Sequence, residues 1–238
     1  MNQHVPDNQD KIWSYYQSTM PESFSGAKPR LDYILQRVST RKKSPTCKIL
    51  DIGVGDGYLE MRGHKLGWDV YALDPDAEAI GKLNKQGIKA QVGYIEHMPF
   101  EDNEFDFVVA SEVLEHLSNE QLKQGIPEIT RVLRDGGWFV GTVPYKDDLS
   151  ASMVVCPACG EIFHRWGHLQ SFDENAIRQL FLGKLVVKVA EPKLFQSWRQ
   201  LNWKGKITAC LKRILFMLRI HGSNENLYFE ARKVPRNR

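Results

Sequence analysis

Apolar runs and helical patterns alternate along the chain from about residue 47 onward. Short runs rich in branched and aromatic residues predict strands over 47–52, 68–74, 90–95, 105–110 and 136–143. Helical patterns separate them, from the glycine-rich turn after residue 52 to Leu66, across Ala77–Lys85 and over roughly 119–133. Such alternation with short loops predicts an α/β fold, in which a mostly parallel sheet has helices on both faces.

The alternation breaks after residue 145 and resumes near Asp173. Apolar runs predict closing strands over 185–195 and 226–234, with a basic amphipathic segment, 198–221, between them. The aromatic-rich N-terminus predicts two short helices around Pro21 and Pro29. We therefore divide the chain into a helical cap (1–40), a core (41–145), an insertion after the fifth strand (146–170) and a C-terminal part of the core (171–238).

The composition limits the class of protein. The chain has 238 residues, of which 42% are hydrophobic and 26% charged, as expected of a globular protein with one large domain or one domain with an insertion. No run of about 18 apolar residues is present, which excludes a conventional membrane-spanning helix. The first residues, MNQHVPDNQDKIW, lack the pattern of a secretion signal, so we expect a cytoplasmic protein.

The most informative motif follows the first predicted strand. Asp51 precedes a G-x-G-x-G turn of Gly53, Gly55 and Gly57, in which small residues let the backbone approach a ligand beside a helix N-terminus. A dinucleotide-binding turn requires G-x-G-x-x-G, and Tyr58 stands where its last glycine would be. Asp74 ends the next strand, where a carboxylate can accept hydrogen bonds from both ribose hydroxyls.

Four segments in order resemble the class I S-adenosylmethionine-dependent methyltransferases. They are DIGVGDG (51–57), the strand-ending Asp74, GYIEHMPFEDNEFDFVVASEVLEHL (93–117) and ITRVLRDGGWFVGTVP (129–144). The resemblance covers about residues 45–145, and the closing strands fit the typical seven-stranded sheet of that Rossmann-like fold. It implies S-adenosylmethionine as the cofactor.

The resemblance also implies roles for individual residues. Gly53, Gly55 and Gly57 would line the methionine moiety, and Asp51 would order the turn and the ammonium group. Asp74 would bind the ribose diol, with Pro75 beside the adenine.

The adenine and sulfonium sides of the site come from later segments. Tyr94 stands where the family often has an acidic residue that meets the adenine amino group. Ile95 would still contribute a backbone N–H and an apolar wall. Ser111 and Glu112 should lie near the sulfonium, at the carboxyl end of the fourth strand.

Methyl transfer is an in-line displacement, so alignment and exclusion of water can supply much of the acceleration. An acceptor hydroxyl would need a base, for which His116 is the best candidate. Glu112, Glu115 and His116 also resemble an E-x-x-E-H cluster of quinone-pathway O-methyltransferases that is associated with a divalent cation. A third interpretation is that Glu115 and His116 only order the following helix.

The insertion contains four residues of metal-ligating type. Cys156, Cys159, His164 and His168 have the spacing C-x2-C-x4-H-x3-H, which is typical of a zinc knuckle. Four protein ligands leave no open position on the ion, so the predicted Zn²⁺ would be structural. The alternative is that the cysteines and histidines never meet a metal.

The charge is distributed unevenly. The net charge is +3, but residues 198–238 carry ten Lys or Arg against two acidic residues. Within 198–221 the basic residues accompany an apolar stripe, a combination typical of interfacial membrane helices. The stripe could equally pack on the sheet or on a second subunit, and the basic face could bind RNA or another anion.

The sequence therefore predicts a methyltransferase acting on a small-molecule acceptor. The acceptor atom would be an oxygen or nitrogen of a sugar, a lipid-linked intermediate or a secondary metabolite. Two alternatives remain, an RNA methyltransferase and a non-catalytic module that binds S-adenosylmethionine. Nucleic acid is the less favoured partner because the chain before residue 198 is net acidic.

Overall fold

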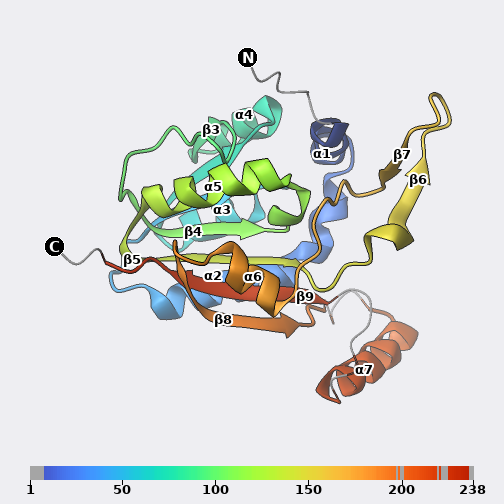
Figure 1. The fold of residues 1–238 in the computed structure, drawn as a ribbon. Coiled ribbons are helices and arrows are strands. Elements are labelled where there is room, and N and C mark those ends of the chain that lie inside the picture. The colour runs from blue at the N-terminus through green and yellow to red at the C-terminus, as the bar shows by residue number, and fades with distance from the viewer. Residues whose placement is uncertain (1–7, 197, 199–200, 219, 221–224, 236–238) are drawn as a thin grey trace.

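The computed structural model describes residues 8–196, 198, 201–218, 220 and 225–235. Its centre is a seven-stranded sheet in the order β3-β2-β1-β4-β5-β9-β8 (Figure 1). The strands are β1 (Lys48–Ile52), β2 (Asp69–Asp74), β3 (Lys89–Val92), β4 (Phe105–Ser111), β5 (Leu133–Pro144), β8 (Val186–Lys193) and β9 (Asn226–Arg232). Strands β1 to β5 are parallel, and β9 lies antiparallel between β5 and β8. The predicted α/β fold with a mostly parallel seven-stranded sheet is confirmed.

Alternate residues of each strand face two helix layers. The layers consist of α5 (Asn119–Val132) and α6 (Glu174–Leu180) on one face, and α2 (Lys28–Arg41), α3 (Tyr58–Lys65) and α4 (Ala77–Lys85) on the other. In β1, Leu50 joins the core that contains Ile126 of α5, whereas its neighbour Ile49 joins the core that contains Leu35 of α2. The period-two alternation of strand side chains thus builds a core on each face.

The predicted N-terminal cap divides into two parts. Helix α1 (Asn8–Thr19) and the 3-10 helix η1 (Pro21–Ala27) cover the carboxyl end of the sheet, where η1 leads into α2. Helix α2 instead belongs to a helix layer because Ile34, Leu35 and Val38 on one helical face are buried against the sheet.

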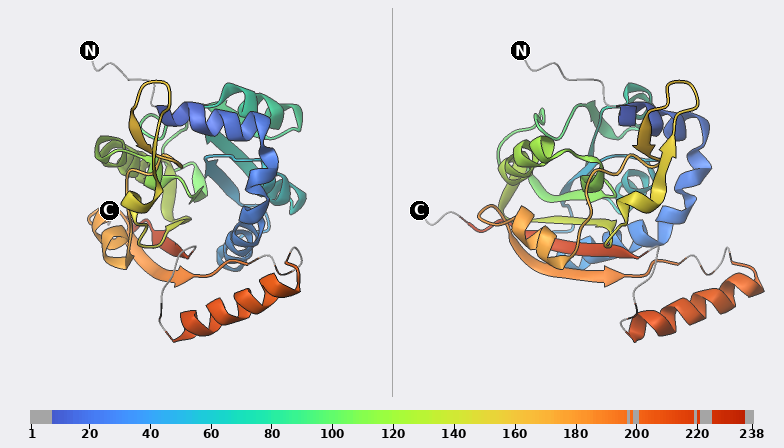
Figure 2. Two further views of the ribbon diagram at one scale, coloured as in Figure 1. Left: turned by 90° about the vertical axis from the view of Figure 1, so that its right-hand side faces the viewer. Right: turned by 45° about the vertical axis from the view of Figure 1, so that its right-hand side comes forward.

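Two segments lie outside the layers (Figure 2). The first follows β5 and consists of the 3-10 helix η3 (Leu149–Ser152) and a hairpin of β6 (Met153–Val155) and β7 (Ile162–His164). The second is α7 (Trp203–Met217), between β8 and β9; parts of the predicted segment 198–221 lie outside the described residues. Among the described helices, none is both long and apolar enough to cross a membrane.

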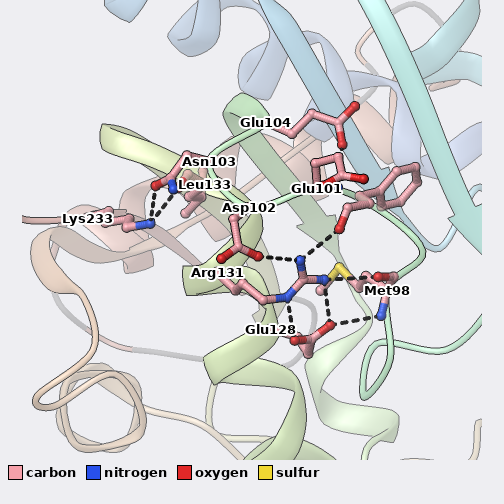
Figure 3. A network of polar contacts seen from close by, with 10 residues as sticks. Met98, Glu101, Asp102, Asn103, Glu104, Glu128, Arg131, Leu133 and Lys233 are labelled. Carbon is pink, nitrogen blue, oxygen red and sulfur yellow. Dashed lines mark hydrogen bonds and ion pairs between the residues drawn. The ribbon is translucent and has the colours of Figure 1, made fainter.

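An arginine network fixes the connection from β3 to β4 (Figure 3). Arg131 of α5 donates from Nη1 to the carbonyl oxygen of Phe100 at 2.7 Å and from Nη2 to that of Met98 at 3.0 Å. Its Nε and Nη2 also donate to the Glu128 carboxylate at 2.7 and 2.9 Å. Tyr94 and Ile95 lie in the same connection, a few residues before Met98. The network therefore helps to hold the segment that carries those two residues.

A buried carboxylate joins α2 to the sheet. Glu230 of β9 is fully buried and accepts hydrogen bonds from Arg37 Nε at 2.7 Å, Arg41 Nη2 at 2.8 Å and the Tyr228 hydroxyl at 2.8 Å. Arg37 and Arg41 lie one turn apart on α2, so both guanidinium groups reach the same carboxylate. The two arginines of α2 therefore compensate the buried negative charge of Glu230.

Candidate cofactor and active site

A cavity of about 820 Å³ opens beside the carboxyl ends of β1, β2 and β4. This is where parallel α/β sheets bind ligands, and the size suits a small-molecule site. The predicted cofactor and catalytic residues that line it are Asp51, Gly53, Gly55, Asp74, Pro75, Tyr94, Ile95, Ser111, Glu112 and His116. These residues come from segments that are separated along the chain and meet at one place.

The glycine turn requires residues without a side chain. Gly53, Gly55 and Gly57 have φ angles of 83°, 53° and 77°, in the left-handed region that favours glycine. A Cβ at Gly53 would lie 2.6 Å from Val113 Cγ2. Gly57 does not line the cavity; it begins α3 and packs against Leu83, where a Cβ would lie 2.9 Å from Cδ2. The predicted contact of Gly57 with the methionine moiety stays a prediction, and in this structure Gly57 packs beside α4.

Asp74 ties the glycine turn to the start of α4. Its carboxylate accepts hydrogen bonds from the backbone N–H of Val54 at 2.9 Å and of Asp76 at 2.8 Å. The side chain of Gln17, on α1, donates a third hydrogen bond at 3.2 Å. Burial raises the pKa of Asp74 above its usual value, while these hydrogen bonds act in the opposite direction. No sequence spacing indicated Gln17, because it reaches the site from the separate helix α1.

Asp51 brings an uncompensated carboxyl group to the cavity. Its Oδ1 is buried and has no hydrogen-bond partner, and the same is true of both carboxyl oxygens of neighbouring Glu60. Burial and then the Glu60 carboxyl raise the pKa of Asp51, and burial and then the charge of Asp74 raise the pKa of Glu60 to about 8. A cationic ligand would compensate this acidic group. Glu60 lies outside the glycine motif and was not predicted from the sequence.

The end of β4 presents Ser111 and Glu112. Arg30 of α2 donates from Nε to Ser111 Oγ at 2.9 Å. Glu112 has a φ of 58°, a strained conformation for a residue with a side chain, of the kind found at functional sites. Its Oε2 accepts from Asn226 Nδ2 at 2.9 Å, whereas its buried Oε1 has no partner. Arg30 and Asn226 come from distant elements and were not predicted.

His116 forms another part of the cavity wall. Its ring meets Trp13 of α1 edge to face, with ring centroids 4.8 Å apart. Its Nδ1 lies 3.3 Å from the carbonyl oxygen of Gly167, and its Nε2 is buried without a partner. Burial and then the nearby His168 lower the pKa of His116 to about 3, so the imidazole is neutral at neutral pH.

Aromatic side chains cover the cavity from outside the sheet. Trp13 and Tyr16 of α1, Phe24 of η1 and Trp166, which follows β7, all line it. Tyr16 and Trp166 have ring centroids 5.8 Å apart, so α1 and the hairpin segment meet over the opening. The individual contacts of these aromatic side chains follow from tertiary packing alone.

The structure does not bring the four predicted zinc ligands together. Cys156 and Cys159 lie in the turn of the β6–β7 hairpin, where the backbone N–H groups of Cys159 and Ala158 lower the pKa of Cys156. His164 is paired with Met153 at the other end of this hairpin and stacks on His168. Among the described residues, the groups whose ligand atoms lie within 4.8 Å of one another are Glu115–His116–His168 and Asp147–His164–His168. Neither group contains a cysteine, so the predicted Cys2His2 zinc site is not supported.

Comparison with protein families gives a match to the central part of the chain. Residues 50–141 match the methyltransferase domain. This methyltransferase domain contains β2, β3 and β4 together with the end of β1 and most of β5, and so includes the glycine turn, Asp74 and His116.

Similar proteins agree with this match. An uncharacterized methyltransferase of Synechocystis is 35% identical over 98 residues, which cover 40% of this chain and 46% of that protein. A sarcosine/dimethylglycine N-methyltransferase of Halorhodospira halochloris is 28% identical over 157 residues, covering 61% of this chain and 56% of that protein. The chain thus spans about half the length of the relatives it matches.

A solved structure supports the fold beyond the methyltransferase domain. An S-adenosylmethionine-dependent methyltransferase of Methanosarcina mazei superimposes with a TM-score of 0.60 at 17% identity, covering 83% of this chain and 97% of that one. The seven-stranded sheet is therefore the Rossmann-like fold of class I methyltransferases.

Proposed function

We propose that the protein transfers a methyl group from S-adenosylmethionine to a small molecule. The observation that carries the proposal is the cavity at the carboxyl ends of β1, β2 and β4, where Asp74 and the glycine turn meet an uncompensated Asp51. The match of residues 50–141 to the methyltransferase domain supports it.

The residues of the cavity fit the chemical groups of this cofactor. Asp74 offers acceptors for ribose hydroxyls, and its hydrogen bond from Gln17 is one that a ligand could replace. The buried Oδ1 of Asp51 has no partner and suits the cofactor's ammonium group. Gly53 and Gly55 let a ligand approach the backbone. When bound, S-adenosylmethionine supplies an electrophilic methyl group on a sulfonium.

The remaining wall suits a small acceptor. Trp13, Tyr16 and Trp166 provide apolar surface, which would position an acceptor and exclude water. Glu112 presents a buried carboxyl oxygen without a partner, which could receive a proton from an acceptor oxygen or nitrogen, and the neutral imidazole of His116 could accept a hydrogen bond from the acceptor. The Halorhodospira relative, named for sarcosine and dimethylglycine, lends support to a small acceptor.

Titration calorimetry with S-adenosylhomocysteine, the spent form of the cofactor, tests the binding step. We expect saturable one-to-one binding and no comparable binding of NAD⁺, because the turn lacks the dinucleotide spacing. A folded protein that binds neither S-adenosylmethionine nor S-adenosylhomocysteine would contradict the proposal. Cofactor binding without transfer to any small acceptor would favour the non-catalytic module, and transfer to RNA would favour the RNA methyltransferase.

We further propose that α7 contacts the surface of a membrane containing acidic lipids. One face of α7, by helical spacing, carries Ala209, Arg213 and Phe216. Ala209 is buried, and Arg213 and Phe216 line a groove against α2. Most of the exposed apolar residues of α7 occupy a different face: Trp203, Ile207, Leu211, Ile214 and Leu218. Leu215 and Met217 are also exposed, and Met217 lines the groove. Trp203 and Leu218 are 67% and 65% exposed. The apolar stripe therefore points away from the body of the protein.

The charges beside the stripe favour an anionic surface. Lys204 and Lys206 flank it by their helical positions, and α7 contains no acidic residue. A bulky apolar face bordered by lysines is the combination that inserts into the interface of an acidic membrane. Contact of α7 with lipid would bring the enzyme to lipid-linked acceptors.

Vesicle co-sedimentation tests the contact of α7 with lipid. We expect binding to vesicles that contain phosphatidylserine and little binding to purely zwitterionic vesicles. Replacing Lys204 and Lys206 with glutamine should weaken binding to the acidic vesicles about 30-fold, because each basic residue near an acidic membrane contributes about 1 kcal/mol. Lys123→Gln, on the exposed surface of α5, is the matched control and should leave it unchanged. Equal binding to both kinds of vesicle, or none, would refute the proposal.

A further inference from the structure

Three side chains with unused ligand atoms meet beside the cavity. Glu115 is 1% exposed, and neither of its carboxyl oxygens has a hydrogen-bond partner. The adjacent His116 has a buried Nε2 without a partner. His168 arrives from the segment after β7 and packs against His116 with ring centroids 4.8 Å apart. One ligand atom from each of the three lies within 4.8 Å of the others.

The hydrogen bonds of both imidazoles leave their Nε2 atoms free to bind a cation. Nδ1 of His116 faces the carbonyl oxygen of Gly167 at 3.3 Å, and Nδ1 of His168 faces Asp147 Oδ2 at 2.6 Å. Because both partners are acceptors, each Nδ1 carries the proton and each Nε2 keeps its lone pair. Metal-ligating histidines almost always make this second hydrogen bond, to a carboxylate or to a backbone carbonyl.

The neighbouring His164 is oriented differently. Its Nδ1 accepts a hydrogen bond from the backbone N–H of His168 at 3.0 Å, which places the proton of the neutral ring on Nε2. That Nε2 lies 3.9 Å from Asp147 Oδ2. His164 therefore does not present a lone pair to the cluster.

From these contacts, we infer that Glu115, His116 and His168 form a binding site for a divalent transition-metal ion. Two imidazoles and one carboxylate are a ligand set used by Zn²⁺ and by other first-row metals, and three protein ligands leave a coordination position open. A bound cation would also compensate the buried Glu115 carboxyl, which is costly without a partner. Asp147 acts as a positioning residue through His168.

This site differs from the Cys2His2 site that the sequence suggested. It shares only His168 with that set. Its other two ligands, Glu115 and His116, belong to the E-x-x-E-H cluster of the sequence analysis, whose Glu112 is not part of the group, and His168 is the ligand that the tertiary structure adds. The insertion after β5 thus contributes a ligand, His168, and its supporting carboxylate, Asp147, next to His116, which lines the cavity.

Metal titration of the full-length, chelator-treated protein tests the inference. We expect one equivalent of Zn²⁺, or of Co²⁺ as a spectroscopic probe, without the thiolate-to-cobalt absorption that cysteine ligands produce. His168→Ala and Glu115→Gln should abolish stoichiometric binding, and Asp147→Asn should weaken it about 10- to 100-fold. The matched control, Cys156→Ser with Cys159→Ser, should bind like the unaltered protein.

Circular dichroism and thermal unfolding report whether each variant folds, and neither depends on cofactor binding or methyl transfer. The metal site is overturned if the metal-free protein binds neither ion. It is equally overturned if folded His168→Ala and Glu115→Gln variants keep one equivalent, or if only the double cysteine variant loses it.

Discussion

Replacing Asp74 with alanine is expected to weaken S-adenosylhomocysteine binding at least about 100-fold, because hydrogen bonds to a charged group contribute about 1.5–3 kcal/mol each. The variant loses the acceptor for the ribose hydroxyls. It also leaves the backbone N–H groups of Val54 and Asp76 without their acceptor, which loosens the glycine turn. Both effects lower the affinity, and titration calorimetry measures their sum.

Asp69→Asn is the matched control for this experiment. Asp69 begins the same strand, β2, but its side chain is exposed and pairs with Lys89 on the surface. We expect its affinity for S-adenosylhomocysteine to equal that of the unaltered protein. If Asp74→Ala remains folded in urea titrations and binds with unchanged affinity, the assignment of Asp74 to the ribose is wrong.

The second large effect concerns stability. Replacing Arg37 and Arg41 together with methionine should lower the free energy of unfolding by about 3–5 kcal/mol, since it leaves a buried carboxylate without its cationic partners. Glu230 is fully buried, and among the side chains that the structure describes the Tyr228 hydroxyl is the one donor that would remain. Urea denaturation followed by circular dichroism measures the loss.

A rescue variant separates lost charge compensation from lost packing. Adding Glu230→Gln to the double arginine variant removes the uncompensated charge and should restore part of the stability. Lys82→Met is the surface control; Lys82 pairs with Glu78 one turn away on α4, so its loss should cost no more than about 0.5 kcal/mol. If the double variant is as stable as Lys82→Met, Glu230 does not depend on the two arginines.

The glycine turn and Asp74 could be found from the sequence because their signal is local. Turn glycines with positive φ and an acidic residue at the end of the next strand occupy fixed places in a βαβ unit. The same logic placed Ser111 and Glu112 at the end of β4.

The zinc prediction shows how spacing can mislead. Four residues within 13 positions suggested one ion, but β6 and β7 form a hairpin that separates the turn with the cysteines from the end with His164. His168 meets Glu115 and His116 instead, about 50 positions earlier in the chain. A regular hairpin orders its residues along its length, and two short strands are enough to separate ligands that are close in sequence.

The sequence by itself determined the parallel sheet, the order of its strands and helices, and the turn that meets the proposed cofactor. Each of these depends on hydrophobic periodicity and backbone conformation, which are written in neighbouring residues. Tertiary structure alone decided that Gln17 reaches Asp74, that Arg30 and Asn226 hold Ser111 and Glu112, and that α7 turns its apolar stripe outward. Those contacts join segments distant in the chain, and their geometry follows from how whole elements pack.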